Sequence, residues 1–112
     1  MVTSSLELKT ELRKILLRHE GRDRAITGME LARILNQRDD RRIRILIREL
    51  IIEDLPIAST TSQPAGYFIP VSYEEAREYA ESIRRRLIEA AIRRRDFRRA
   101  VQLRLAKQGR LC

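Results

Sequence analysis

The chain contains few of the residues that most catalytic and metal sites require. Among its 112 residues are one Cys, one His and four Gly. Cys112 alone cannot close an internal disulfide or build a zinc site, and the scattered glycines form no phosphate-binding loop. His19, on the apolar side of a predicted helix, is most simply a packed or capping residue. We therefore expect that the protein is not an enzyme and has no catalytic residues, metal or cofactor.

Aromatic residues and long apolar runs are also scarce. The chain has no Trp, three Tyr and two Phe, so its core must be built from Leu, Ile, Val and Ala. The longest apolar stretches, residues 45–47 and 50–52, are far shorter than the roughly 20 residues of a membrane-spanning helix. The N-terminus reaches Glu7 without an apolar run, so no signal peptide is expected. We expect a cytoplasmic protein of one modest domain.

Charge of one sign dominates. There are 24 Lys and Arg against 16 Asp and Glu, a net charge of +8, and most of the cations are Arg. The planar guanidinium suits phosphates and guanine edges, so this balance favours a polyanionic partner. Simple solubility is the alternative explanation of a net positive charge.

Capping residues and apolar spacing predict four helices. A hydroxyl residue followed by Glu three positions later marks three helix starts, at Ser4, Thr27 and Ser72. Asp39 is expected to cap a further helix. The predicted helices cover residues 5–19, 28–35, 40–52 and 73–108. The expected inward residues are Leu8, Leu12, Ile15, Leu16 and His19, then Leu31, Ile34 and Leu35, then Ile43, Leu46, Ile47 and Leu50.

A β-hairpin is predicted between the third and fourth helices. Residues 57–60 and 67–69 are short and β-prone, and the turn-rich segment 61–66 lies between them. Asn36, in the tight turn 36–38, suits a left-handed conformation. The fold class is therefore mainly α with a small β-hairpin. We expect a winged helix-turn-helix domain over residues 1–71 and a long basic C-terminal helix over residues 72–112, with roles in core closure and possible dimerisation.

The order and spacing of these elements resemble winged-helix DNA-binding domains of the biotin-repressor type. The matching segments are Ile26–Ala32, Asp39–Leu50, Pro56–Ser59 and Gly66–Phe68. The resemblance implies that the third helix enters the major groove and that the hairpin, the wing, touches the backbone or an adjacent minor groove. The sequence departs from the pattern in two respects: Glu53 and Asp54 replace a usual Gly, and the wing carries no Lys or Arg. Residues 28–71 hold six Arg and six acidic residues, so this segment is neutral.

Duplex DNA binding is the predicted function, in a small transcriptional regulator or a phage- or plasmid-type accessory factor. Arg41, Arg44 and Arg48 recur at helical spacing on the third helix and offer bidentate donors to base edges. Glu49 and Glu53 could pair with arginines of the same helix, which would make this row an ordinary solvated face. The predicted DNA-binding residues are Thr27, Arg38, Arg41, Arg42, Arg44, Arg48, Thr60, Thr61, Ser62 and Gln63.

The last helix carries most of the positive charge. Residues 72–112 hold eleven Arg and one Lys against six acidic residues. Arg84, Arg85, Arg93, Arg94, Arg95, Arg98 and Arg99 could contact phosphates or a partner, or form a solvated helix end. An apolar seam through Ala76, Ala80, Ile83, Leu87 and Ala90 or Ala91, continued by Phe97, Val101 and Leu105, suggests a homodimer, parallel or antiparallel.

Two other functions are compatible with these features. The same surfaces could form a protein-interaction module of a larger assembly, which the neutral third-helix region would suit. The C-terminal arm could instead bind RNA or a membrane surface. The shortage of aromatics disfavours base stacking, and arginines on all sides of the helix disfavour a membrane-surface helix. No small-molecule ligand is implied.

Overall fold

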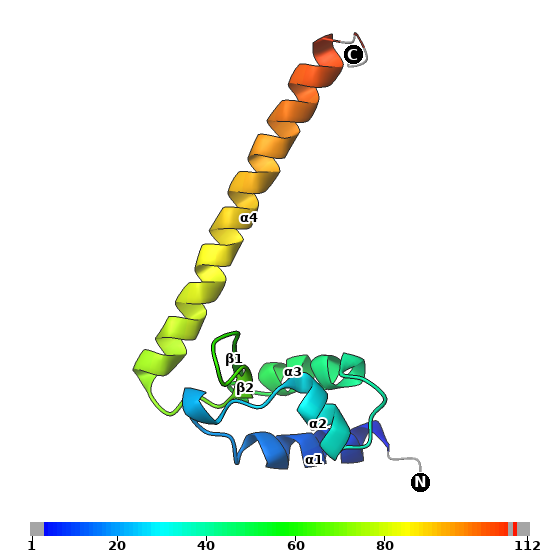
Figure 1. Ribbon diagram of the computed structural model, residues 1–112, viewed down its shortest axis with the longest axis vertical. Helices are drawn as coiled ribbons and strands as arrows, with labels where there is room; N and C mark the ends of the chain where they lie inside the picture. Colours follow the sequence, from blue (N-terminus) through cyan, green and yellow to red (C-terminus); the bar gives the residue numbers. More distant parts are fainter. Residues whose placement is uncertain (1–3, 108, 110–112) are drawn as a thin grey trace. The chain divides into compact units, whose positions relative to one another are not determined.

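The computed structural model describes residues 4–107 and 109. Its elements are α1 (Ser5–Leu16), the 3-10 helix η1 (Arg22–Arg24), α2 (Gly28–Ile34), α3 (Arg41–Ile52), β1 (Ala58–Thr60), β2 (Gly66–Phe68) and α4 (Tyr73–Lys107) (Figure 1). The described part of the chain is mainly helical, with a two-stranded antiparallel hairpin and a long C-terminal helix. This confirms the predicted fold class at that level.

The chain divides into two compact units, residues 1–79 and residues 80–112. The first contains α1 to β2 and the opening turns of α4, and the second contains the rest of α4. Within the first unit, Arg22 Nη1 lies 3.9 Å from Glu78 Oε2, which joins η1 to the start of α4. The compact unit thus extends past residue 71, where the sequence analysis places the end of the domain.

An aliphatic core fills the first unit. The predicted stripe of α3 is buried in full, and α1 contacts α3 through its own buried face. Each fully buried Leu or Ile contributes about 1.5–3 kcal/mol of hydrophobic stabilisation relative to the exposed side chain. The core residues are Leu8, Leu12, Leu16, Ile26, Leu31, Ala32, Ile43, Leu46, Ile47, Leu50, Leu55, Ile57 and Ile69.

Hydroxyl caps start three of the helices, as predicted. The Oγ atom of Ser4, Thr27 and Ser72 each accepts a hydrogen bond of 3.1 Å from the backbone N–H three residues later. Such a cap typically contributes about 1 kcal/mol to helix stability. At the last helix Glu75 also reaches back, but its Oε1 accepts from the N–H of Val71, the residue before the cap, at 3.3 Å.

The predicted end of α1 is wrong: the helix stops at Leu16, not at His19. His19 leaves the helix because its carbonyl accepts a hydrogen bond from the N–H of Ile69 at 2.9 Å. Its Nδ1 lies 2.8 Å from the carbonyl oxygen of Arg24, which can only accept, so Nδ1 carries the proton. Backbone pairing with a distant segment, which local spacing cannot show, therefore takes precedence over the last helical turn.

The predicted inward face of α2 is wrong at one position. Leu31 and Ala32 are buried, whereas Ile34 is exposed. At 100° per residue, Ile34 lies about 60° from Leu31 and about 160° from Ala32, on the side of Leu31 away from Ala32. With seven residues, α2 is too short to pack a second row of apolar side chains against another element.

A third segment extends the hairpin. Ser59 pairs with Tyr67 between β1 and β2, and Tyr67 also exchanges two backbone hydrogen bonds with Ile26, of 2.7 and 2.9 Å. Gly66 permits this contact: its φ is +128°, and a Cβ there would lie 2.2 Å from the carbonyl oxygen of Ile26. Only glycine fits at this position. The predicted left-handed turn at Asn36 is present, with φ of 55°.

Candidate nucleic-acid interface

The exposed side of α3 carries both arginine and isoleucine. Ile43, Leu46, Ile47 and Leu50 face the core, so Arg41, Ile45, Arg48 and Ile52 point to the opposite side. All four are exposed, and Ile45 and Ile52 keep 56% and 72% of their surface. The guanidinium groups of Arg41 and Arg48 form no ion pair within residues 4–107 and 109. Two of the three arginines predicted to contact base edges, Arg41 and Arg48, are therefore not held in ion pairs.

The acidic residues beside this face pair with a lysine of another helix. Lys9 Nζ of α1 lies 3.5 Å from Glu49 Oε1 and 2.5 Å from Glu53 Oε2. Hydrogen bonding to Glu53 is the largest cause that raises the pKa of Lys9 above its ordinary value, followed by the negative charges of both carboxylates. The alternative, in which Glu49 and Glu53 pair with Arg41, Arg42 or Arg48, is not found among the described residues. Because Glu49 and Glu53 pair with Lys9, they do not pair with the arginines of α3.

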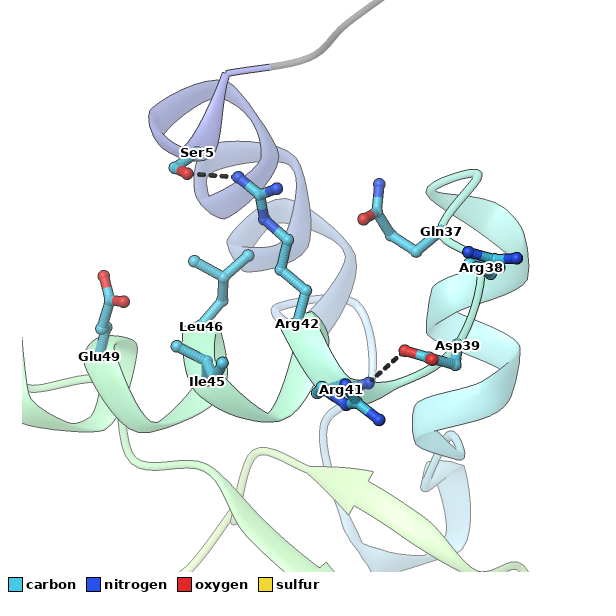
Figure 2. A pocket seen from close by; sticks show the side chains of 9 residues that line it. All are labelled: Ser5, Gln37, Arg38, Asp39, Arg41, Arg42, Ile45, Leu46 and Glu49. Atoms are coloured by element: carbon cyan, nitrogen blue, oxygen red, sulfur yellow. Dashed lines mark hydrogen bonds between the residues drawn. The ribbon is translucent and has the colours of Figure 1, made fainter.

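A cleft of about 490 Å³ lies beside the start of α3 (Figure 2). Arg38, Arg41 and Arg42 line it together with Gln37 and with Ser5 from α1. Arg42 reaches toward α1 and donates a hydrogen bond to Ser5 Oγ. The cleft also contains Asp39, Ile45, Leu46 and Glu49. It thus brings together three of the predicted arginines, from the α2–α3 connection and the first turn of α3.

The Asp39 carboxylate is hydrogen-bonded to the first residue of α3. Its Oδ1 accepts a hydrogen bond of 3.0 Å from the N–H of Arg41, but the N-cap residue of α3 is Asp40, so the predicted cap is wrong by one residue (Figure 2). This bond holds the carboxylate against a helix N-terminus, where negative charge is favourable. The electrostatic repulsion between the Asp39 carboxylate and an anionic partner is reduced accordingly.

Arg44 occupies a different environment from Arg41 and Arg48. Its Nη2 lies 3.3 Å from Asp40 Oδ1. Asp40 and the ring of Tyr67 pack against Gly28, where a Cβ would approach the Asp40 carboxylate to 3.1 Å. Burial raises the pKa of the Tyr67 hydroxyl, the nearby Asp40 charge acts in the same direction, and Arg44 opposes them. Arg44 therefore also serves the junction between α2, α3 and β2.

The predicted contacts outside α3 are polar but largely engaged in local structure. Thr27 caps α2 through its hydroxyl oxygen. Thr60 Oγ1 accepts a hydrogen bond of 3.1 Å from the N–H of Ser62, which stiffens the hairpin loop. Thr61, Ser62 and Gln63 are exposed at the loop, and none of the hairpin residues lines the cleft. No residue from 55 to 73 is charged.

The seven predicted arginines of α4 are all exposed. Two of them pair within the helix: Arg84 Nη1 lies 3.3 Å from Glu81 Oε1, and Arg95 Nη2 lies 3.2 Å from Asp96 Oδ1. Exposed pairs of this kind contribute little to stability. The arginines surround the helix rather than line one side, so α4 presents positive charge in every direction over its second half.

Several residues that contribute to the α3 surface were not predicted from the sequence. Lys9, Ser5 and Gln37 are ordinary polar residues in the sequence, and only the fold brings them to α3. One signal was present: Glu49 and Glu53 stand four residues apart, so they share one edge of a helix that a cation from a neighbouring helix could serve. Tyr67 gave no such signal, because its neighbours come from three separate elements.

Within the described ranges, no three His, Cys, Asp or Glu side chains are grouped to hold a metal ion. None of the helices there is both long and apolar enough to cross a membrane. No family model, curated protein or solved structure matches the chain significantly.

Proposed function

We propose that the protein binds duplex DNA, with α3 in the major groove. The observation that carries the proposal is the state of the α3 surface: Arg41 and Arg48 are exposed and unpaired in the described chain, while the adjacent Glu49 and Glu53 pair with Lys9 instead of with them. A helix of this width fits the major groove, and bidentate arginine contacts to guanine discriminate by about 1–3 kcal/mol each. The exposed methyl groups of Ile45 and Ile52 suit the thymine methyl.

Arg38 and Arg42 suit phosphates in this arrangement. They line the cleft beside the start of α3, where the Asp39 carboxylate already accepts from the N–H of Arg41, so the guanidinium groups supply the attraction for a phosphate. Arg44 is shared with Asp40, so its part in reading bases is smaller than that of Arg41 or Arg48. Contacts to phosphate fix the position of a protein on the duplex, and contacts to base edges supply the sequence preference.

The hairpin has the role of a wing without charge. Thr61, Ser62 and Gln63 offer hydroxyl and amide groups to a phosphate or a minor-groove edge. The pairing of Tyr67 with Ile26 ties the base of the hairpin to the segment before α2, so the loop projects from a rigid support. The order of helices and hairpin is the one implied by the winged-helix resemblance. A DNA target also suits the predicted cytoplasmic location.

Fluorescence anisotropy with a pool of duplex DNA fragments tests the proposal. The double variant Arg41→Glu/Arg48→Glu should lose binding at about 50 mM salt, where phosphate contacts are strongest. Arg13→Glu/Arg18→Glu is the matched control, because it changes the net charge equally at exposed sites on and after α1. Equal loss in both variants would show only nonspecific attraction. Retained binding in the α3 variant would reject the proposal.

A protein-interaction role has one specific observation in its favour. Ile45, Ile51 and Ile52 of α3 are all exposed and lie beside the arginines. Arginine is enriched at protein interfaces, and the buried centre of an interface is more apolar than the rest of the surface. If the wild-type chain shows no DNA binding in the experiment above, this becomes the leading function, and substitution of Ile45 and Ile52 by Asp is the next test.

A further inference from the structure

The part of α4 after Tyr79 has an apolar side with nothing over it. The α4 seam, as we define it, consists of Ala80, Ile83, Leu87, Ala90, Phe97 and Val101. At 100° per residue these positions fall within about a third of the helix circumference. Leu87 and Phe97 keep 69% and 68% of their surface, and no described residue of α4 is buried. Two charged residues lie within the same arc: Arg94 near its middle, and Arg98 at its edge, directly in line with Ala80.

A helix of this kind gains little from its own side chains. Isolated helices are marginal in water, and most helical stability in proteins comes from packing of an apolar face. The seam repeats at alternating steps of three and four residues on either side of Arg94, as in helices that pair with another helix. A cover for the seam is therefore expected, and the remaining question is what supplies it.

We propose that the cover is a second copy of this chain, with the two α4 helices antiparallel and in one particular register. In that register, the numbers of facing seam residues add up to 177. This inference does not rest on DNA binding, and it selects one of the two directions that the sequence leaves open.

The sizes of the seam residues favour this register. Ala80 faces Phe97 of the second copy, and Leu87 faces Ala90 of the second copy, so each small side chain meets a large one. Between these two layers, Ile83 faces the aliphatic stem of Arg94, whose guanidinium can reach solvent. Alternation of large and small residues across an interface allows close packing without voids.

The charges favour the same direction. Residues 74–83 hold four Glu and one Arg, a net charge of −3, and they would face residues 94–103 of the second copy, which hold four Arg and one Asp, a net charge of +3. This attraction occurs twice, once at each end. The middle segment, residues 84–93, has a net charge of +3 and faces itself, which opposes association once.

A parallel pair has no such compensation. Each of the three segments would then lie against its own copy, so all three would repel. It would also set Phe97 against Phe97 and Ala80 against Ala80, which leaves uneven layers along the seam. Antiparallel pairing is therefore the better arrangement on both charge and size.

Sedimentation of the full chain at several concentrations is the first test. The wild-type chain of 13.2 kDa should reach twice that mass as its concentration rises. Leu87→Asp should remain a monomer over the same range. The matched control is Leu103→Asp, at an equally exposed position on the opposite side of the helix, with 60% of its surface exposed. A wild-type chain that stays monomeric, or equal loss of the dimer in both variants, would overturn the proposal.

Spin labels determine the direction. In a chain whose Cys112 is replaced by Ser, a label at Gln102→Cys should give a distance of about 40 Å between the two copies, because residues 102 lie at opposite ends of the pair. A label at Ile88→Cys, near the centre, should give less than about 20 Å. Short distances at both sites would mean a parallel pair and reject the proposed register. The helical circular dichroism of each variant shows whether it is folded.

Discussion

The helices of residues 4–79 and those of residues 80–107 are stabilised in different ways. In the first region, α1, α2 and α3 each bury apolar residues, and backbone pairing of His19 with the distant Ile69 follows the end of α1. In the second, α4 continues for nearly eight turns without a buried residue, and only local hydrogen bonds and two ion pairs support it. The contrast shows that a helix can be strongly specified by its sequence and still lack the packing that normally stabilises it.

Hydrogen exchange should show the largest difference between the two regions. Amides of Ile47 and Leu50 should be protected more than about 1000-fold, since they open only on global unfolding. At low micromolar concentration, amides of residues 84–107 should have little protection and should exchange nearly as fast as those of an isolated helix in water. At high concentration, protection of residues 84–107 should rise if the α4 helices pair. Equal, concentration-independent protection in both regions would contradict the contrast drawn above.

Substitution of two glycines separates backbone crowding from backbone conformation. Gly66 and Gly109 both have positive φ, but a Cβ at Gly66 meets the backbone of Ile26, and a Cβ at Gly109 meets nothing within 4 Å. Gly66→Ala should cost at least about 3 kcal/mol of unfolding free energy in urea, because strain and a backbone clash add. Gly109→Ala should leave the unfolding of the first region unchanged. A wild-type urea midpoint for Gly66→Ala would refute the close approach.

Two leucines of α1 test the core of the first region. Leu12 is fully buried, and Leu6 keeps 71% of its surface. Leu12→Ala should lower the free energy of unfolding by about 2–5 kcal/mol, because it removes apolar contacts and leaves a cavity. Leu6→Ala should change it by less than about 0.5 kcal/mol. Similar losses in both variants would mean that α1 packs through a different face.

Lys9 gives the smallest effect, and its sign depends on pH. Because the pKa of Lys9 is raised in the folded protein, its contribution is complete below the ordinary value of 10.5 and is lost as pH rises through the folded value. Lys9→Met should be less stable than wild type at neutral pH, and the difference should narrow in alkaline solution. Tyr67, whose pKa is also raised, is common to both proteins.

The control for this prediction is Lys14→Met, on the same helix. Lys14 Nζ lies 3.4 Å from Glu11 Oε1, and both side chains are more than half exposed. Its loss should change the melting temperature little at any pH. A gap between Lys9→Met and wild type that stays constant through the alkaline range would show that the lysine charge is not the cause.

Features determined by neighbours in sequence were predictable. The hydroxyl caps at Ser4, Thr27 and Ser72, the buried stripe of α3, the hairpin and the uninterrupted α4 all follow from local spacing. Features that depend on distant pairing were not. The end of α1 at Leu16 depends on the bond between His19 and Ile69, and the state of Glu49 and Glu53 depends on Lys9, 40 and 44 residues away.

The candidate interface follows the same division. Helical spacing predicted that Arg41 and Arg48 would lie away from the core, because that property belongs to α3 alone. It could not predict that Arg44 would be shared with Asp40 beside Tyr67, since this junction requires α2, α3 and β2 together. The cleft likewise needs Ser5 from the other end of the first unit.

The tie between Tyr67 and Ile26 has a practical consequence for work with this protein. It anchors the hairpin at its base and leaves residues 61–63 as an exposed, uncharged tip outside the core. Such a tip tolerates insertions better than any helix of the first unit. A dye or a short epitope placed after Ser62 would therefore report on this surface while the remainder of the fold stays intact.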